Sequence, residues 1–148
     1  MIQAGIDPLK TLNEVPDNYL MGNWNLLEIT IPDNINVIGE SAFAECEYLN
    51  KVILPKELVE IRDNAFNTCS SLNSIVLPKS LRKIGINNFY FCENLNTVVY
   101  EGTKEEFKNI EIDDDCFKLC PDLDMIKCSD SSIYFDDNNY ELFLDDED

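Results

Sequence analysis

The chain of 148 residues carries six cysteines and 29 acidic residues but no histidine, so any chemistry it performs would rest on thiols and carboxylates. Thiolates bind metal ions, and clustered carboxylates bind Ca²⁺ or serve as paired acid and base. The common nucleophile–base pairs need histidine, and the five glycines include no phosphate-binding loop. The sequence therefore predicts a protein with no catalytic residues and no cofactor, which is not an enzyme.

The cysteines and the acidic clusters both suit structural roles. The cysteines fall on inward positions of a repeat, where a small apolar residue packs; they are Cys46, Cys69, Cys92, Cys116, Cys120 and Cys128. No Cys-x-x-Cys pair occurs, so we predict buried free thiols and no metal site. The clusters Asp113–Asp115 and Asp136–Asn139 lack the pattern of a Ca²⁺ loop and are predicted to be solvated turns.

The chain repeats itself every 23 residues. Units that begin at Leu26, Leu49 and Leu72 read LLEITIPDNINVIGESAFAECEY, LNKVILPKELVEIRDNAFNTCSS and LNSIVLPKSLRKIGINNFYFCEN, and the next unit begins at Leu95. Proline, isoleucine, phenylalanine and cysteine recur in phase in all three units. A period of this length is typical of a solenoid, in which stacked units bury a continuous core that one unit could not bury alone.

Each unit predicts two extended segments and one helical segment. Leu-x-x-Ile-x-Ile alternates as a short strand with one buried face, and the proline after it ends the strand. A second short extended segment and a turn follow. Ala-Phe-x-x-Cys-x-x-Leu places apolar residues three apart, which predicts one or two helical turns. The predicted fold is an α/β repeat solenoid of about five coils, each with a short strand and a helical turn.

We expect a single domain over residues 1–148. Residues 1–25 are predicted to form a diverged first coil that caps the stack, with Leu12 and Val15 facing inward, and residues 26–122 are predicted to form the repeats.

An insertion near residues 102–111 interrupts the last repeat. Thr103 followed by Glu105 and Glu106 predicts a capped helical turn within it. Residues 123–148 are predicted to close the stack with a β-hairpin, in which IYF and YELFL flank DDNN, and to end in an acidic tail.

This pattern resembles the BspA-like leucine-rich repeat family, also called the Treponema pallidum type. The resemblance rests on Ile-x-Ile-Pro, Val-x-x-Ile-Gly and Ala-Phe-x-x-Cys-x-x-Leu within residues 26–128, and on the insertion from Tyr100 to Phe107. It implies a leucine-rich repeat fold. Proteins of this family are typically bacterial or protozoan surface adhesins and host-interaction proteins, so the resemblance also implies a role of that kind.

In such a solenoid the outward side chains of the first strand of each unit face the concave side, where a partner protein would bind. The predicted binding residues are Glu28, Thr30, Lys51, Ile53, Ser74, Val76, Thr97 and Val99. Among them Ile53, Val76 and Val99 form a β-branched stripe. This stripe is either an apolar binding surface or a consequence of strand propensity.

A second candidate surface departs from the repeat. Ile86, Tyr90 and Phe91 are apolar at outward positions where earlier units carry mostly polar residues. They either anchor an interface with a partner, pack beneath the insertion or form a self-association contact, and we expect them to pack beneath the insertion. The acidic residues of this alternative surface are Asp113, Asp114, Asp115, Asp136 and Asp137.

The leading hypothesis is a non-catalytic module that binds a partner protein through its concave strand face. The alternative is an acidic inhibitor or nucleic-acid mimic, such as a phage-encoded anti-defence protein, that occupies a basic groove of its target. Its basis is charge, because residues 101–148 carry 17 acids and 4 bases, whereas residues 1–100 carry 12 and 7. Such a field disfavours direct nucleic-acid binding.

The location follows from what the sequence lacks. It shows no apolar run of membrane-spanning length and no signal peptide, and its thiols favour a reducing compartment. We expect a cytoplasmic protein, or a cell-surface protein from which an export segment has been removed.

Overall fold

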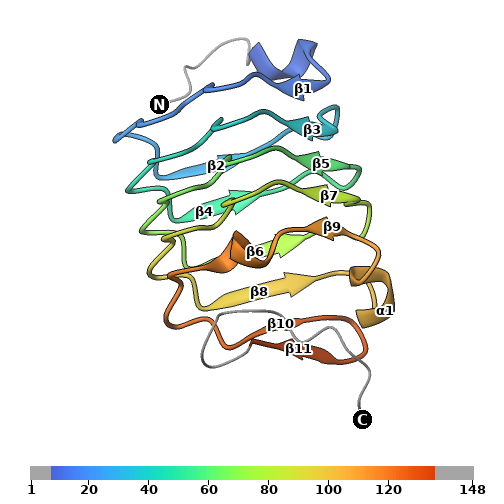
Figure 1. The fold of residues 1–148 in the computed structure, drawn as a ribbon. Coiled ribbons are helices and arrows are strands. Elements are labelled where there is room, and N and C mark those ends of the chain that lie inside the picture. Colours follow the sequence, from blue (N-terminus) through green and yellow to red (C-terminus); the bar gives the residue numbers. More distant parts are fainter. Residues whose placement is uncertain (1–7, 136–148) are drawn as a thin grey trace.

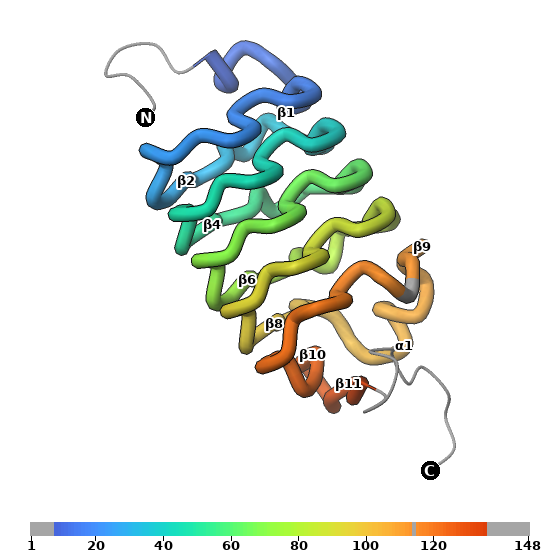
Figure 2. The backbone as a smooth tube through the Cα atoms, turned by 60° about the vertical axis from the view of Figure 1, so that its left-hand side comes forward, coloured from blue at the N-terminus to red at the C-terminus, as the bar shows by residue number. Residues whose placement is uncertain are grey.

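The computed structural model describes residues 8–135, apart from the side chain of Asp114. The chain winds into a stack of coils, and the strands of successive coils line up in two rows (Figure 1). Most coils contribute one strand to each row. The first row consists of β2 (Glu28–Thr30), β4 (Lys51–Ile53), β6 (Ser74–Leu77), β8 (Thr97–Tyr100) and β10 (Met125–Lys127). The second row consists of β1 (Glu14–Val15), β3 (Val37–Ile38), β5 (Glu60–Ile61), β7 (Lys83–Ile84) and β9 (Glu111–Ile112). Figure 2 shows the coils as successive layers.

Neighbouring coils pair in parallel and in phase with the repeat. Glu28 of β2 lies opposite Lys51 of β4, and Ser74 of β6 lies opposite Thr97 of β8. Strands β4 and β6 are also in contact, so the first row continues from β2 to β10. The 23-residue period therefore sets the register, and the predicted solenoid is confirmed.

The segment that follows β1, β3, β5 and β7 is a series of turns rather than the predicted helical turn, whereas β9 is followed by a short 3-10 helix. Some of its amides bond within the coil, as Ala44 does to the Ser41 carbonyl at 3.2 Å. The amides between them bond to the next coil, as Phe43 does to the Ala65 carbonyl at 2.8 Å. Ser41 and Glu45 also have φ of 56° and 60°, in the left-handed region. Two such residues in each of the first four coils prevent a right-handed helix from forming there.

A column of aromatic rings runs through the centre of the coils. Its four rings stack nearly parallel, with centroids 5.4, 5.6 and 5.3 Å apart, and belong to Phe43, Phe66, Phe89 and Phe117. Tyr19 packs edge-on against the first ring, and Phe135 packs edge-on against the last. We call these four residues the phenylalanine ladder. Because each ring contacts the next coil, the ladder couples the coils into one core.

At every second junction between coils, a carboxylate of one coil and a glycine of the next are in contact at the turn after the second row. Asp63 Oδ1 accepts the amide N–H of Ile86, one coil later, at 2.9 Å. A Cβ on Gly85 would lie 2.5 Å from the amide nitrogen of Asp63 and would also meet its carboxylate, so only glycine fits there. The same contact occurs two coils earlier among Asp17, Gly39 and Glu40, with a hydrogen bond of 2.8 Å.

The insertion contains the helix α1 (Lys104–Phe107). The Oγ1 of Thr103 accepts the amide N–H of Glu106 at 3.1 Å, and Glu106 Oε1 accepts the amide N–H of Thr103 at 3.0 Å. This is a complete capping box, and the predicted capped helical turn is confirmed. Elsewhere in residues 8–135 the helical segments are two short 3-10 helices, η1 (Pro8–Thr11) and η2 (Asp114–Phe117).

The two ends of the stack differ from the prediction in detail. At the N-terminal end Leu9 is buried, whereas Leu12, expected to face inward, is 40% exposed. At the C-terminal end β11 (Ser132–Tyr134) pairs antiparallel with β10, so the described hairpin turns before the predicted one. The DDNN and YELFL segments of the predicted hairpin lie outside the described residues.

Candidate functional site

The outward side chains of the first row form the surface that the sequence predicts as the binding face, and we call it the first-strand face. Glu28, Thr30, Lys51, Ile53, Ser74 and Val76 are exposed, and Thr97 and Val99 are half-buried. The alternate residues of the same strands point into the core, as Ile29, Val52, Ile75 and Val98 do. The structure therefore brings the eight predicted residues together on one face.

An apolar stripe crosses the middle of the first-strand face. Ile53 is 46% exposed and Val76 is 48% exposed, on adjacent strands, and the half-buried Val99 follows on β8. Since Val76 lies directly opposite Val99 in the ladder, these side chains are neighbours rather than scattered residues. Burying the stripe against a partner would remove exposed apolar surface from water, which favours association.

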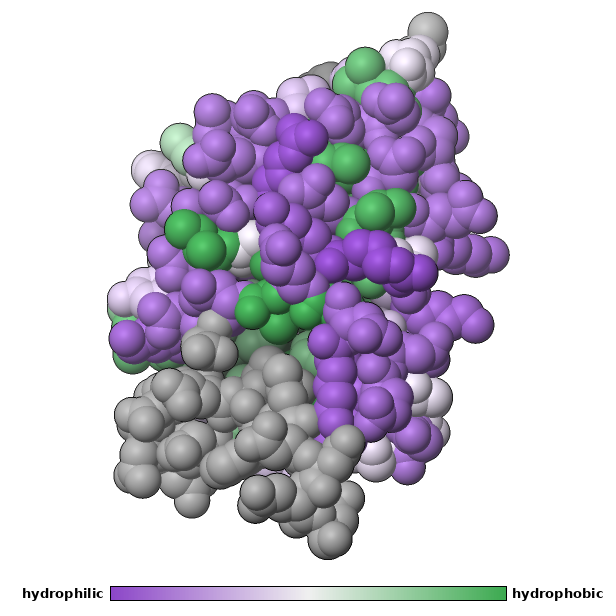
Figure 3. Space-filling view, turned by 45° about the vertical axis from the view of Figure 1, so that its right-hand side comes forward, coloured by the Kyte–Doolittle hydropathy of each residue, from purple (hydrophilic) through white to green (hydrophobic). Residues whose placement is uncertain are grey.

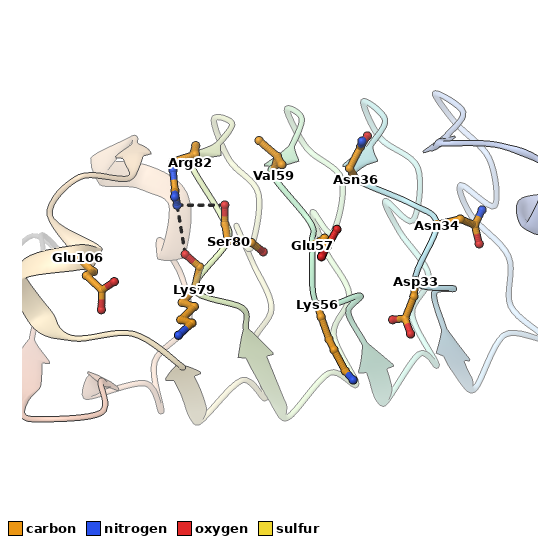
Figure 4. A pocket seen from close by; sticks show the side chains of 10 residues that line it. All are labelled: Asp33, Asn34, Asn36, Lys56, Glu57, Val59, Lys79, Ser80, Arg82 and Glu106. Carbon is orange, nitrogen blue, oxygen red and sulfur yellow. Dashed lines mark hydrogen bonds between the residues drawn. The ribbon is translucent and has the colours of Figure 1, made fainter.

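A polar groove borders the face where each coil turns from the first row towards the second (Figure 4). Its volume is about 750 Å³. Three coils line it with residues at the same repeat positions, and α1 adds Glu106; the coil residues are Asp33, Asn34, Asn36, Lys56, Glu57, Val59, Lys79, Ser80 and Arg82. This groove was not predicted from the sequence, although its coil residues recur every 23 positions in the repeat.

The groove is balanced in charge, with three carboxylates and three bases. Arg82 is fixed at its wall because Nη1 donates to the backbone carbonyls of Lys79, Ser80 and Leu81 at 3.1, 3.1 and 3.0 Å. The hydrogen bond from the Thr103 amide holds the pKa of Glu106 below its usual range, and the nearby charges of Lys79 and Arg82 add to this effect. A chain with a net charge of −18 thus keeps a balanced surface beside the apolar stripe.

The alternative apolar residues do not lie beneath the insertion. Ile86 is 47% exposed and Phe91 is 41% exposed, so the expectation that they pack under it is wrong. The insertion packs elsewhere, with Phe107 edge-on against Tyr100 at 5.3 Å. Tyr90 is half-buried and its ring contacts that of Phe91.

The acidic triplet after β9 is partly engaged in local structure. Asp113 Oδ1 accepts the amide N–H of Asp115 at 2.8 Å and so caps η2. Asp115 lies 3.9 Å from the ammonium of Lys118. The side chain of Asp114, together with Asp136 and Asp137, lies outside what the structure describes.

No cluster of three or more metal-binding side chains occurs within the described residues. Figure 3 shows hydrophilic side chains covering most of one flank, with apolar patches between them.

The six cysteines are free, and five of them are buried. Four thiols repeat one hydrogen bond, from Sγ to a backbone carbonyl of the preceding coil at 3.1–3.2 Å; the donors are Cys46, Cys69, Cys92 and Cys120. Burial raises the pKa of all six thiols, that of Cys120 to about 12 and that of the half-buried Cys128 to about 11. The thiols are neutral packing groups, as the repeat predicts.

The raised thiol pKa values predict a protein that loses stability in alkali. Above about pH 9 an unfolded cysteine releases its proton while the folded one keeps it, so the free energy of unfolding falls as pH rises. Each buried thiol contributes about 1.4 kcal/mol per pH unit until its folded pKa is reached. Urea titrations at about pH 8 and about pH 10 should differ by several kcal/mol, and Cys69→Ala should reduce the difference. Equal stability at the two pH values would contradict this account.

Comparison with known proteins agrees with this geometry. The BspA type leucine-rich repeat region matches residues 13–142 in six copies. A leucine-rich repeat protein of T. pallidum is 34% identical, with a TM-score of 0.69 over 76% of this chain and 50% of that protein. A leucine-rich cell surface protein of Faecalibacterium prausnitzii shares the fold, with 24% identity and a TM-score of 0.72 over 81% of this chain and 30% of that one.

A leucine-rich repeat protein of Bacteroides capillosus is 29% identical, with a TM-score of 0.53 over 62% of this chain and 64% of that one. Among curated proteins none matches. The chain spans half the length of the T. pallidum protein and less of the Faecalibacterium protein. Within residues 8–135 no helix is long and apolar enough to cross a bilayer. With most of its length matched by the repeat, the chain belongs to the BspA-type leucine-rich repeat family.

Proposed function

We propose that this chain is a non-catalytic module that binds a partner protein through the first-strand face. The observation that carries the proposal is the apolar stripe, in which Ile53 and Val76 are nearly half exposed on adjacent strands. Side chains of this kind gain little from folding when they stay in water, but they contribute to an interface when a partner covers them.

The charges beside the stripe support the proposal that the first-strand face binds the partner. Among the described residues, Lys51, Lys56 and Lys79 form no ion pair. The second row differs, because there Lys83 pairs with Glu111 at 3.1 Å. Because these lysines have no ion-pair partner within residues 8–135, they can contact carboxylates of a partner protein. The rest of this acidic chain would repel such carboxylates.

The test is a double substitution in the stripe. Ile53→Glu with Val76→Glu adds two charges where the partner is proposed to pack, so partner binding should weaken at least about tenfold. The measurement is affinity capture from the source cells with mass spectrometry, followed by titration of the captured partner. Tyr48→Glu is the matched control, since Tyr48 is 55% exposed and lies outside the first-strand face.

Both variants should keep the circular dichroism spectrum of the parent, because the altered side chains are already exposed. A partner that binds the double variant as well as it binds the parent would place the interface elsewhere. The cytoplasmic location and the acidic-inhibitor hypothesis both stay predictions.

A further inference from the structure

A small apolar hollow lies on the turns of the last two coils, away from the first-strand face. Its volume is about 180 Å³, and Phe91, Glu93, Leu119 and Pro121 line it. Phe91 and Leu119 belong to adjacent coils, since the amide of Phe91 donates to the carbonyl of Lys118 at 2.9 Å. Phe91 is 41% exposed and Leu119 is 37% exposed.

Folding does not explain why these two residues are large and apolar. Both occupy a left-handed position that recurs in every coil, with φ of 58° at Phe91 and 62° at Leu119. The equivalent residues of the earlier coils are Gly22, Glu45 and Thr68. The left-handed conformation gives no advantage to a large apolar side chain, and partial exposure limits what such a side chain gains from burial.

The surroundings of the hollow are acidic. The segment 118–124, which supplies Leu119 and Pro121 to the hollow, contains two aspartates and one lysine. That lysine, Lys118, already faces Asp115 at 3.9 Å. Glu93 lines the hollow itself, and Asp122, next to Pro121 in the chain, is exposed. An occupant would therefore meet an apolar floor and a rim of negative charge.

We propose that the hollow between Phe91 and Leu119 binds a basic segment of a partner protein, which inserts one aliphatic side chain. The volume suits a single side chain rather than a drug-sized molecule. The acidic rim repels nucleic acid and anionic lipid, and it attracts lysine and arginine on either side of the inserted residue. The hollow is independent of the first-strand face, so either surface can bind without the other.

Two labelled peptides test the proposal, KRKLKRK and KRKSKRK, which have the same charge and differ at the central residue. Fluorescence anisotropy at physiological salt should show about tenfold tighter binding of the leucine peptide, because only it fills the hollow. Phe91→Thr, which copies the residue found at Thr68, should remove this preference, and so should Leu119→Thr. Tyr48→Thr is the neutral control and should leave the preference unchanged, since Tyr48 is 55% exposed and lies outside both the hollow and the first-strand face.

Amide chemical shifts of the unaltered protein give a readout that does not depend on the folding of a variant. The leucine peptide should shift the signals of Phe91 and Leu119 more than the serine peptide does. Equal affinity for the two peptides, or a preference that survives both substitutions, would overturn the proposal. So would light scattering that shows a dimer lost in Phe91→Thr, since a second copy of the chain would then be the occupant.

Discussion

Replacing Phe66 by alanine should lower the free energy of unfolding by about 3–5 kcal/mol. The ring is fully buried and stacks on Phe43 at 5.4 Å and on Phe89 at 5.6 Å, so its loss leaves a cavity between two coils. The coils on either side are held by their backbone ladders and cannot close the gap fully. Urea denaturation followed by circular dichroism gives the measurement.

An exposed aromatic residue provides the control for that substitution. Tyr48→Ala should cost well under about 1 kcal/mol, because Tyr48 is 55% exposed and lies outside the phenylalanine ladder. Phe66→Leu refills part of the space and should fall between the two alanine variants. If Phe66→Ala unfolded at the same urea concentration as Tyr48→Ala, the ladder would not be what couples the coils.

Gly85→Ala is the second substitution with a large expected effect. The added Cβ would lie 2.5 Å from the amide nitrogen of Asp63 and 2.8 Å from the carbonyl carbon of Arg62. These are backbone atoms of the preceding coil, so the clash can be relieved only by moving the coils apart. We expect a loss of about 3 kcal/mol in the free energy of unfolding, measured by thermal or urea denaturation.

Two further variants separate the clash from other effects of losing a glycine. Gly22→Ala has open space around the new Cβ but a φ of 73°. It should therefore lower the free energy of unfolding by only about 1–2 kcal/mol, which is the cost of a left-handed conformation in a residue with a Cβ. Asp63→Ala alone loses one hydrogen bond, at about 1 kcal/mol. Asp63→Ala combined with Gly85→Ala should remain strongly destabilised, because the backbone of the preceding coil still blocks the Cβ. Full rescue by Asp63→Ala would show that the carboxylate alone requires the glycine.

Much of this fold could be predicted because the repeat fixes the register. Residues 23 apart in the chain lie side by side in the ladder, as Lys51 and Glu28 do, so aligning the units was enough to place the exposed and buried residues of the first row. The same alignment placed the thiols in the core. It also places Ile53 and Val76 together as a candidate site.

The turns were harder to predict because residue type alone does not determine backbone conformation. Ser41, Glu45 and Phe91 adopt positive φ although none is glycine, and the spacing of apolar residues in those segments imitates a helix. The insertion packs through contacts that do not recur from coil to coil, such as that of Phe107 with Tyr100. No periodic pattern predicts a contact that occurs once in the chain.

The contact between Asp63 and Gly85 has a consequence for how such a chain can change in length. It occurs at every second junction between coils, first with Asp17 and Gly39 and then with Asp63 and Gly85. Deleting one 23-residue unit from the middle would place Asp17 beneath Arg62, or leave Gly85 without its aspartate. Deleting two units together, 46 residues, would set Asp17 beneath Gly85 and restore the contact. The sequence repeats every 23 residues, but the coils are interchangeable only in pairs.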